Sequence, residues 1–299
     1  MVDKEIIFMI IIKIQGGLGN QLFQYAFGRT IERKYAKKVA YDISSYGAVK
    51  KNTPRAYHLD KFNTPVTIAT KEEILNCKYP FGSFSKITYI IKKLSNKLFF
   101  KRYHISFEPE FLESIKNTDS AYLEGYWQSF RYIEPALPDL KKEVTLKVPP
   151  SAAIEVLKAE ISLSDSVAIH IRRGDYVQGG VDLQVLDIVY YKSAINLVSQ
   201  KTEDAKYYIF TDDAVWAKKN LNFIEKGKVT YVSDFTLADY EELMLMAQCK
   251  HVIVANSSFS WWGAMLNQNK NAMIICPKDW KNVFLKNDMN LCPEKWIRI

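Results

Sequence analysis

Short apolar runs alternate along the chain with longer segments whose apolar residues recur at helical spacing. The first apolar run, at 6–14, is followed by a glycine-rich turn, a segment with helical spacing at 21–38 and a second apolar run at 39–44. A bilayer span takes about 20 apolar residues, so the first run is too short for one and predicts a buried strand. These segments predict a βαβ unit with a parallel sheet, and Asn20 is the expected N-cap of its helix.

A second series of strands and helices follows a break at residues 148–151. The break contains Pro149 and Pro150, which cannot continue either kind of element, and a helix is expected to begin at Ala152. Strands are then predicted at 166–171, 206–211 and 251–255, and helices at 186–200, 237–249 and 257–266. This alternation is typical of doubly wound α/β folds, so we expect two Rossmann-like domains, 1–149 and 150–299, facing a cleft.

The segment at 43–125 has a less regular pattern, with helices predicted at 71–75 and 85–102. The second of these helices has apolar residues on one face and lysines and arginines around it. Basic amphipathic helices lie on anionic membrane surfaces in some proteins and dock on the protein core in others. Both interpretations of residues 86–102 stay open, and peripheral contact with an inner membrane is therefore one hypothesis.

The net charge of +8 and the pI near 9.0 favour an anionic partner, although a lysine-rich surface explains them equally well. The four cysteines are scattered without a CxxC pair and there are four histidines, so neither a zinc cluster nor a disulfide framework is expected. We expect free thiols in a cytoplasmic protein. RNP, KH and zinc-binding patterns are missing from the sequence, so a nucleic-acid-binding protein is a less favoured alternative.

Polar clusters follow four of the predicted strands, at 16–21, 170–175, 211–213 and 256–260. Ligands of open α/β sheets bind beyond the carboxyl ends of the strands. The most informative cluster holds Arg172 and Arg173, whose guanidinium groups match phosphate oxygens and point to opposite faces of a strand. One arginine is expected to reach a phosphate ligand while the other holds neighbouring carboxylates. Asp175, after Gly174, either braces an arginine or faces the reacting centre.

The cluster at 256–260 lies where a buried strand meets the start of a helix. Asn256, Ser257 and Ser258 would therefore lie beside free backbone N–H groups, which bind phosphate. Helix capping needs only one serine, so the cluster exceeds what capping requires. Trp261 and Trp262 are expected to be packing residues.

Asp212 and Asp213 are adjacent, and no DxD motif occurs in the sequence. We therefore expect no metal site: the pair should cap the next helix, with one aspartate hydrogen-bonding a ligand hydroxyl.

The glycines at 16–19 also allow a competing interpretation. They resemble the start of a dinucleotide-binding GxGxxG motif, and Asp42 lies at the end of the next strand, where a ribose partner would be. The third glycine is replaced by Leu22, and an NAD-dependent enzyme would leave the arginine pair without a role. We favour glycines that permit close approach of a substrate or of the opposite domain.

Four stretches together resemble the bacterial α-1,2-fucosyltransferases of glycosyltransferase family 11. They are GGLGNQLFQYAFG at 16–28, HIRRGDY at 170–176, FTDD at 210–213 and NSSFSWWGA at 256–264. The resemblance implies a GT-B-like α/β fold and metal-independent, inverting transfer of L-fucose from GDP-fucose to the 2-hydroxyl of a galactose-type acceptor. It implies no cofactor and no nucleic-acid partner. A fucosyltransferase of another linkage is the alternative.

The resemblance also assigns roles to individual residues. Arg172 matches the family's essential arginine and is expected at the β-phosphate, with Asp175 as the first candidate for the catalytic base. Donor-binding roles are expected for a larger set, which comprises Gly17, Asn20, His170, Arg173, Asp212, Glu242, Asn256, Ser257, Ser258 and Phe259. Glu242 stands where relatives have an aspartate that reads the guanine edge.

Several points stay open in the sequence. The base is Asp175, Asp182, Asp187 or no residue at all. The N-terminal domain is expected on the acceptor side and the C-terminal domain at GDP-fucose. The acceptor is expected to be a surface polysaccharide or oligosaccharide, and a lipid-linked acceptor is a further hypothesis.

Overall fold

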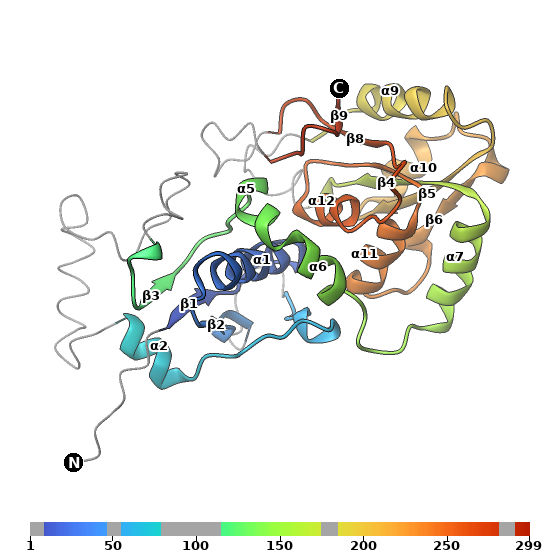
Figure 1. Ribbon diagram of the computed structural model, residues 1–299. Helices are drawn as coiled ribbons and strands as arrows, with labels where there is room; N and C mark the ends of the chain where they lie inside the picture. Colours follow the sequence, from blue (N-terminus) through green and yellow to red (C-terminus); the bar gives the residue numbers. More distant parts are fainter. Residues whose placement is uncertain (1–8, 47–54, 79–114, 175–184, 281–290) are drawn as a thin grey trace, which may run out of the picture. The chain divides into compact units, whose positions relative to one another are not determined.

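A computed structural model describes residues 9–46, 55–78, 115–174, 185–280 and 291–299 (Figure 1). The chain divides into two compact units, Met1–Asp60 with Thr64–Glu143 and Lys61–Asn63 with Val144–Ile299. The division lies a few residues before the Pro149–Pro150 break. Residues 61–63 join the second unit because Asn63 N–H donates to Thr145 O (3.0 Å) and Lys147 N–H donates to Lys61 O (2.8 Å). The predicted helix at 85–102 lies outside the described residues.

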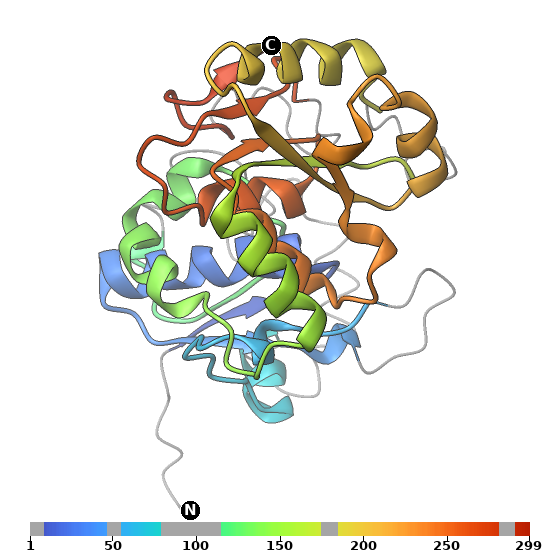
Figure 2. The same cartoon turned by 90° about the vertical axis from the view of Figure 1, so that its right-hand side faces the viewer.

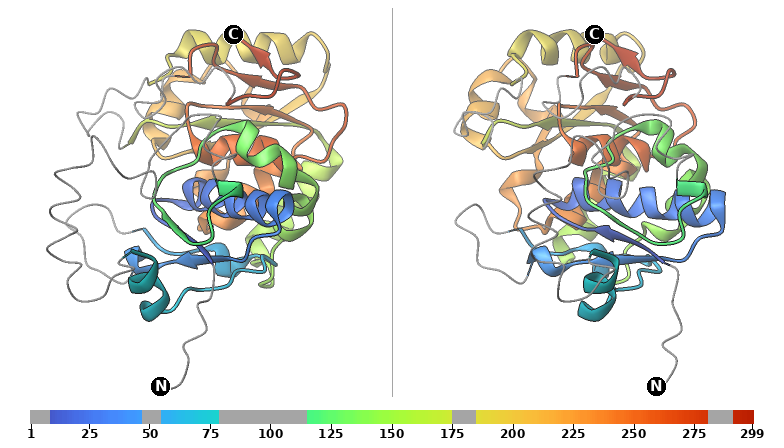
Figure 3. Two further views of the ribbon diagram at one scale, coloured as in Figure 1. Left: turned by 60° about the vertical axis from the view of Figure 1, so that its left-hand side comes forward. Right: turned by 90° about the vertical axis from the view of Figure 1, so that its left-hand side faces the viewer.

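The first unit is built on a parallel sheet with the strand order β2–β1–β3. Its strands are β1 (Ile10–Lys13), β2 (Val39–Asp42) and β3 (Ala121–Leu123), with α1 (Leu18–Tyr35) and α2 (Lys71–Lys78) on opposite faces of the sheet (Figure 3). The remaining elements are η1 (Ser44–Tyr46), α5 (Phe130–Ile133), η4 (Glu134–Ala136) and α6 (Leu137–Glu143), and η2 (Leu59–Lys61) ends on the first residue of the 61–63 segment. The predicted βαβ unit is present.

Strand alternation divides the core of this unit between the two helices. Ile11 and Tyr122 pack toward α2, whereas Tyr41 packs under α1, where its hydroxyl donates to Tyr25 O (3.0 Å). A Cβ on Gly28 of α1 would lie 2.2 Å from the Tyr41 hydroxyl oxygen, so this close approach of helix and strand requires glycine.

The predicted N-cap of α1 was wrong. Gly17 is the N-cap, and its carbonyl accepts hydrogen bonds from the N–H groups of Asn20 (2.9 Å) and Gln21 (3.1 Å). Asn20 lies within the first helical turn, where its side-chain oxygen accepts from Gln128 Nε2 (2.7 Å). Local capping rules could not reveal a partner that is distant in sequence.

The second unit is a six-stranded parallel sheet with the order β6–β5–β4–β7–β8–β9. The strands are β4 (Asp165–Ile171), β5 (Ala205–Thr211), β6 (Val229–Tyr231), β7 (His251–Ile253), β8 (Ile274–Cys276) and β9 (Ile297–Arg298). The helices are α7 (Ala152–Leu163), α9 (Ile188–Ser199), α10 (Ala214–Asn220), α11 (Asp239–Gln248) and α12 (Ser258–Met265), with η5 (Lys226–Lys228) and η6 (Val232–Asp234).

Helices cover both faces of this sheet, as a doubly wound fold requires (Figure 2). One face of β4, with Val167, Ile169 and Ile171, packs against α9 and α10. The helices α7, α11 and α12 lie on the other face (Figures 1 and 2). The helix expected from Ala152 is confirmed as α7, with Ser151 as its N-cap.

Among the helices that the structure describes, none combines the length and the apolar character that a transmembrane span requires.

Candidate functional site

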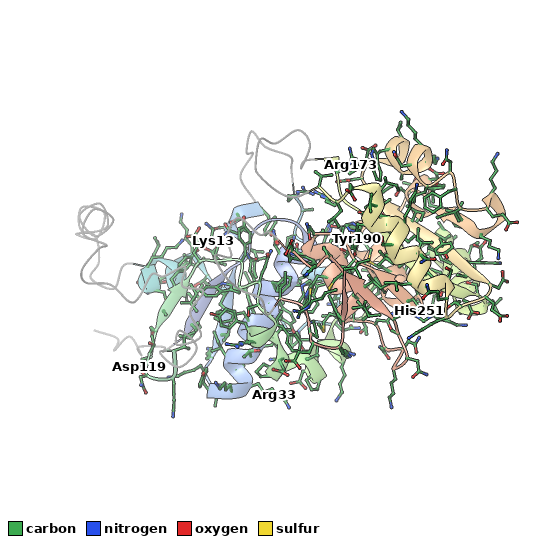
Figure 4. All side chains as sticks on the ribbon, turned by 90° about the horizontal axis from the view of Figure 1, so that it is seen from above. Lys13, Arg33, Asp119, Arg173, Tyr190 and His251 are labelled. Carbon is green, nitrogen blue, oxygen red and sulfur yellow. The ribbon has the colours of Figure 1, made fainter. Side chains whose placement is uncertain are left out.

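The two arginines that follow β4 lie beside side chains from both faces of the sheet. His170 points to the face covered by α12, with its ring centroid 5.6 Å from that of Phe259. Ile171 belongs to the core on the α9 side, and Arg173 reaches α10 on that same side. Arg173 and His251 lie at opposite ends of the sheet (Figure 4), because one follows β4 and the other begins β7.

Arg172 pairs with the aspartate at the end of the neighbouring strand. Its Nη1 lies 3.0 Å from Asp212 Oδ2, and the other oxygen of that carboxylate accepts the backbone N–H of Arg173 at 2.8 Å. A Cβ on Gly174 would lie 3.0 Å from Asp212 Oδ2, so the turn passes tightly over this carboxylate. Asp212 thus fixes both the side chain of Arg172 and the backbone that follows it.

Arg173 is held by α10. Its Nε lies 3.3 Å from Asp213 Oδ2, and its guanidinium carbon lies 4.3 Å from the centre of the Trp216 ring. The other oxygen of Asp213 accepts the Trp216 N–H (3.0 Å), so Asp213 caps α10 as the sequence predicted. The sequence predicted that one arginine would hold carboxylates, and in the structure each of the two pairs with one aspartate.

His170 is a buried, neutral imidazole. Burial, together with the charge of Arg172, lowers its pKa to about 3. Its Nδ1 is enclosed and has no hydrogen-bond partner among the described residues. At neutral pH His170 therefore offers an uncharged ring beside Arg172 and Phe259.

The serines at the start of α12 have different structural duties. Ser257 Oγ caps the helix by accepting from Phe259 N–H (3.3 Å), and buried Ser260 Oγ accepts from Ala255 N–H (3.2 Å). The Ser258 side chain is half-buried and makes no hydrogen bond in the described structure. Asn256 is buried immediately before this turn. Ser258 is thus the serine whose hydroxyl is available to a ligand.

The tryptophans of α12 are packing residues, as expected. Trp261 and Trp262 are fully buried, and the Trp261 indole N–H donates to Leu291 O (2.8 Å).

Two adjacent glutamates begin α11, at the same sheet edge as the start of α12. Glu241 is structural, since its carboxylate accepts from the N–H groups of Ser151 (3.0 Å) and Ala238 (3.1 Å). Burial, together with the nearby charge of Asp239, raises the pKa of Glu242 to about 7. Of these two glutamates, Glu242 is therefore the one whose carboxyl group is poised to change its charge near neutral pH.

Gly17 and Asn20 belong to the first unit, where they begin α1. Asp42 of that unit is fully buried, accepts from the Tyr122 hydroxyl (2.6 Å) and Ser44 N–H (2.9 Å), and has a lowered pKa despite burial because of these bonds. An enclosed carboxylate with these partners does not reach a ribose, which removes the main support for the dinucleotide-binding alternative.

Of the candidate bases, only Asp187 lies within the described residues. Its Oδ1 accepts from the N–H groups of Val189 (3.0 Å) and Tyr190 (3.1 Å), so it is the N-cap of α9. Asp175 and Asp182 lie outside the described ranges. Within those ranges, no three His, Cys, Asp or Glu side chains gather where they would share a metal ion.

The model of the family described as Glycosyl transferase family 11 matches residues 9–299. This chain belongs to glycosyltransferase family 11. An alpha-1,2-colitosyltransferase of Escherichia coli is 30% identical over 97% of this chain and 99% of that protein. The O-antigen biosynthesis glycosyltransferase WbnK of Escherichia coli is 26% identical over 96% and 99%. Human galactoside alpha-(1,2)-fucosyltransferase 1 is 30% identical over 33% of this chain and 28% of its own length.

Solved structures show the fold of this family 11 glycosyltransferase. Fucosyltransferase NodZ from Bradyrhizobium superposes with a TM-score of 0.52 at 13% identity, over 86% of this chain and 93% of NodZ. POFUT1 in complex with GDP gives a TM-score of 0.51 at 12% identity, over 90% and 98%. The predicted GT-B-like α/β architecture is therefore confirmed.

The contact between Arg173 and Trp216 was not predicted from the sequence. Trp216 lies in the first turn of α10, three residues after Asp213. The signal was present, because an aromatic residue one turn after an Asp–Asp pair lies close to the pair's side chains. The sequence did not reveal that β4 pairs with β5, and this pairing brings Arg173 onto the Trp216 ring.

Proposed function

We propose that this glycosyltransferase transfers L-fucose from GDP-fucose to the 2-hydroxyl of a galactose-type acceptor glycan, with inversion and without a metal ion. The observation that carries the proposal is the position of Arg172, at the end of β4 beside His170 and Asp212. NodZ was co-crystallised with GDP and soaked with GDP-fucose, which supports a nucleotide diphosphate donor here.

The chemistry assigned to Arg172 is electrostatic. Breaking the sugar–phosphate bond leaves negative charge on the β-phosphate, and a guanidinium that never loses its proton stabilises that charge. The free N–H groups at the start of α12 and the Ser258 hydroxyl add hydrogen bonds to the diphosphate. These groups together supply the positive potential that a metal ion provides in other glycosyltransferases.

Glu242 is the proposed reader of guanine. Guanine presents two N–H donors on one edge, and an ionised carboxylate accepts both. Half-buried Glu242 is one methylene longer than the aspartate expected from the family, and its raised pKa shows that the surroundings penalise its charge. Guanine N–H donors would offset that penalty, so binding is expected to favour the ionised form.

The acceptor is inferred from the relatives. Both the colitosyltransferase and the human enzyme are named for α-1,2 transfer, and the human enzyme is named for a galactoside acceptor. WbnK is named for O-antigen biosynthesis, which supports a surface-polysaccharide acceptor. We assign the acceptor to the first unit and leave the base as Asp175, Asp182 or no residue.

A second candidate donor is GDP-activated colitose. The colitosyltransferase matches nearly the whole chain, and colitose is L-fucose without its 3-hydroxyl. The two donors differ only in the sugar. They share the diphosphate and the guanine, which are the parts that the described site residues are proposed to bind.

The decisive experiment incubates the protein with GDP-fucose or GDP-colitose and terminal β-galactosides, in the presence of EDTA. We expect transfer from one donor and an α-1,2 linkage in the product, determined by NMR. We also expect Arg172→Ala to abolish transfer while circular dichroism stays unchanged. Absence of both transfer and donor hydrolysis in the wild-type protein, or an active Arg172→Ala variant, would contradict the proposal.

A further inference from the structure

The side chain of Arg173 contacts a residue of α10 and the N-cap residue of that helix. The Trp216 ring lies under its guanidinium, and Asp213 Oδ2 lies 3.3 Å from its Nε. Tyr191, which is buried in the core, meets the Trp216 ring edge-on, with centroids 6.2 Å apart and an interplanar angle of 63°. The aromatic platform under Arg173 is therefore itself supported by the core of the unit.

These contacts continue to Arg172 through the backbone and Asp212. The Arg173 N–H donates to Asp212 Oδ1 (2.8 Å), and Asp212 Oδ2 lies 3.0 Å from Arg172 Nη1. The side chain of Arg173 is thus anchored on α10, while its backbone and Arg172 are anchored on one carboxylate. A turn held at both points presents Arg172 in a defined orientation.

We propose that Trp216 and Asp213 are positioning residues that orient Arg172 by holding Arg173 as the fixed point of the 172–174 turn. In this arrangement the guanidinium of Arg173 contacts Trp216 and Asp213, and the guanidinium of Arg172 binds the donor phosphate. Cation–π contacts with tryptophan are the strongest of their kind and gain strength where the cation is partly desolvated, as it is here with Arg173 at 19% exposure.

This inference rests on the proposed function, because it takes Arg172 as the ligand of the donor's β-phosphate. The contact with the β-phosphate determines what should be measured, namely the affinities for GDP and GMP. GDP has a β-phosphate and GMP lacks it, so misorienting Arg172 weakens GDP binding and leaves GMP binding unchanged. Damage to the fold of the whole unit weakens both.

The test compares Trp216→Leu, Trp216→Phe and wild-type protein by calorimetric titration with GDP and GMP. Leucine fills space without an aromatic face, so we expect about tenfold weaker GDP binding and unchanged GMP binding. Phenylalanine keeps a ring and should restore most of the GDP affinity. Transfer rates should fall and recover in the same order.

Phe223→Leu is the matched control. Phe223 carries the comparable contact of the Lys192 ammonium, which lies 5.3 Å from its ring centroid. It follows α10, at the end of the helix away from the arginines, so GDP affinity should not change.

Asp213→Asn provides a second variant that keeps the helix cap, since asparagine caps helices as well as aspartate does. It loses the charge opposite Arg173 and should weaken GDP binding selectively, by less than Trp216→Leu. Trp216→Leu with wild-type GDP affinity, or with equal losses for GDP and GMP, would overturn the inference. Failure of the proposed function is distinguishable, because the wild-type protein itself would then bind no GDP.

Discussion

Arg172 and Asp212 form an ion pair across the carboxyl ends of β4 and β5, with Nη1 and Oδ2 3.0 Å apart. The two side chains are 23% and 26% exposed, so the pair is neither buried nor freely solvated. The same carboxylate accepts the Arg173 N–H, and this second bond makes Asp212 part of the turn rather than only a counter-charge.

Substitutions of Asp212 should therefore separate its two duties. Asp212→Ala removes the acceptor for Arg173 N–H and the partner of Arg172, and we expect transfer to fall about 10- to 100-fold. Asp212→Asn keeps an oxygen that accepts the Arg173 N–H, so its transfer rate should fall by less. Initial rates at saturating acceptor measure both, and equal losses in the two variants would show that the backbone hydrogen bond is unimportant.

The two serines of α12 that do not cap it should respond oppositely to alanine. Ser260→Ala removes a buried acceptor of the Ala255 N–H, and we expect a loss of about 1–3 kcal/mol in the free energy of unfolding. Ser258→Ala touches no internal hydrogen bond, so stability should hold while GDP affinity falls about tenfold. Urea denaturation and calorimetric titration test the pair; a destabilised Ser258→Ala variant would contradict the assignment.

GDP binding should depend on pH through Glu242. Its pKa of about 7 in the free protein means that the carboxyl group is protonated in acid, and only the ionised form accepts both guanine N–H donors in charge-assisted hydrogen bonds. Affinity should therefore fall by up to about tenfold per pH unit below pH 7 and level off above it. His170, with a pKa near 3, stays neutral throughout this range.

Glu242→Gln is the control for this dependence. The amide does not titrate, so the variant should show only the dependence that arises from the phosphates of GDP itself. GDP affinities of the variant and the wild-type protein would be measured between pH 5.5 and 8.5. The same dependence on pH in both proteins would refute the role of Glu242.

Gly28→Ala should lower the free energy of unfolding, because it disturbs the packing of α1 on β2. The added Cβ would meet the Tyr41 hydroxyl, which is fixed by its bond to Tyr25 O, and overpacking of this kind costs about 1–3 kcal/mol. Gly227→Ala is the matched control, since a Cβ there meets nothing within 4 Å. Chemical denaturation of both variants measures the difference, and equal stabilities would show that Tyr41 can move aside.

Much of the second unit was predictable because its signals are local. Short apolar runs located β4, β5 and β7, and helical spacing located α9, α11 and α12 within a few residues. The Pro149–Pro150 break placed the start of α7 correctly, with Ser151 as its N-cap. The N-cap of α1 was misplaced because the side chain of Asn20 has a better partner, Gln128, far along the chain.

The sequence by itself determined which residues stand at the strand ends, since polar residues that follow a buried apolar run must lie at its edge. It also predicted that Arg172 and Arg173 serve different partners, because successive residues of an extended chain point to opposite sides. Only the tertiary structure decided which side chains contact each arginine. Asp212, Asp213 and Trp216 come from a neighbouring strand and helix about 40 residues away, and no local pattern encodes which side chains such long-range pairing brings together.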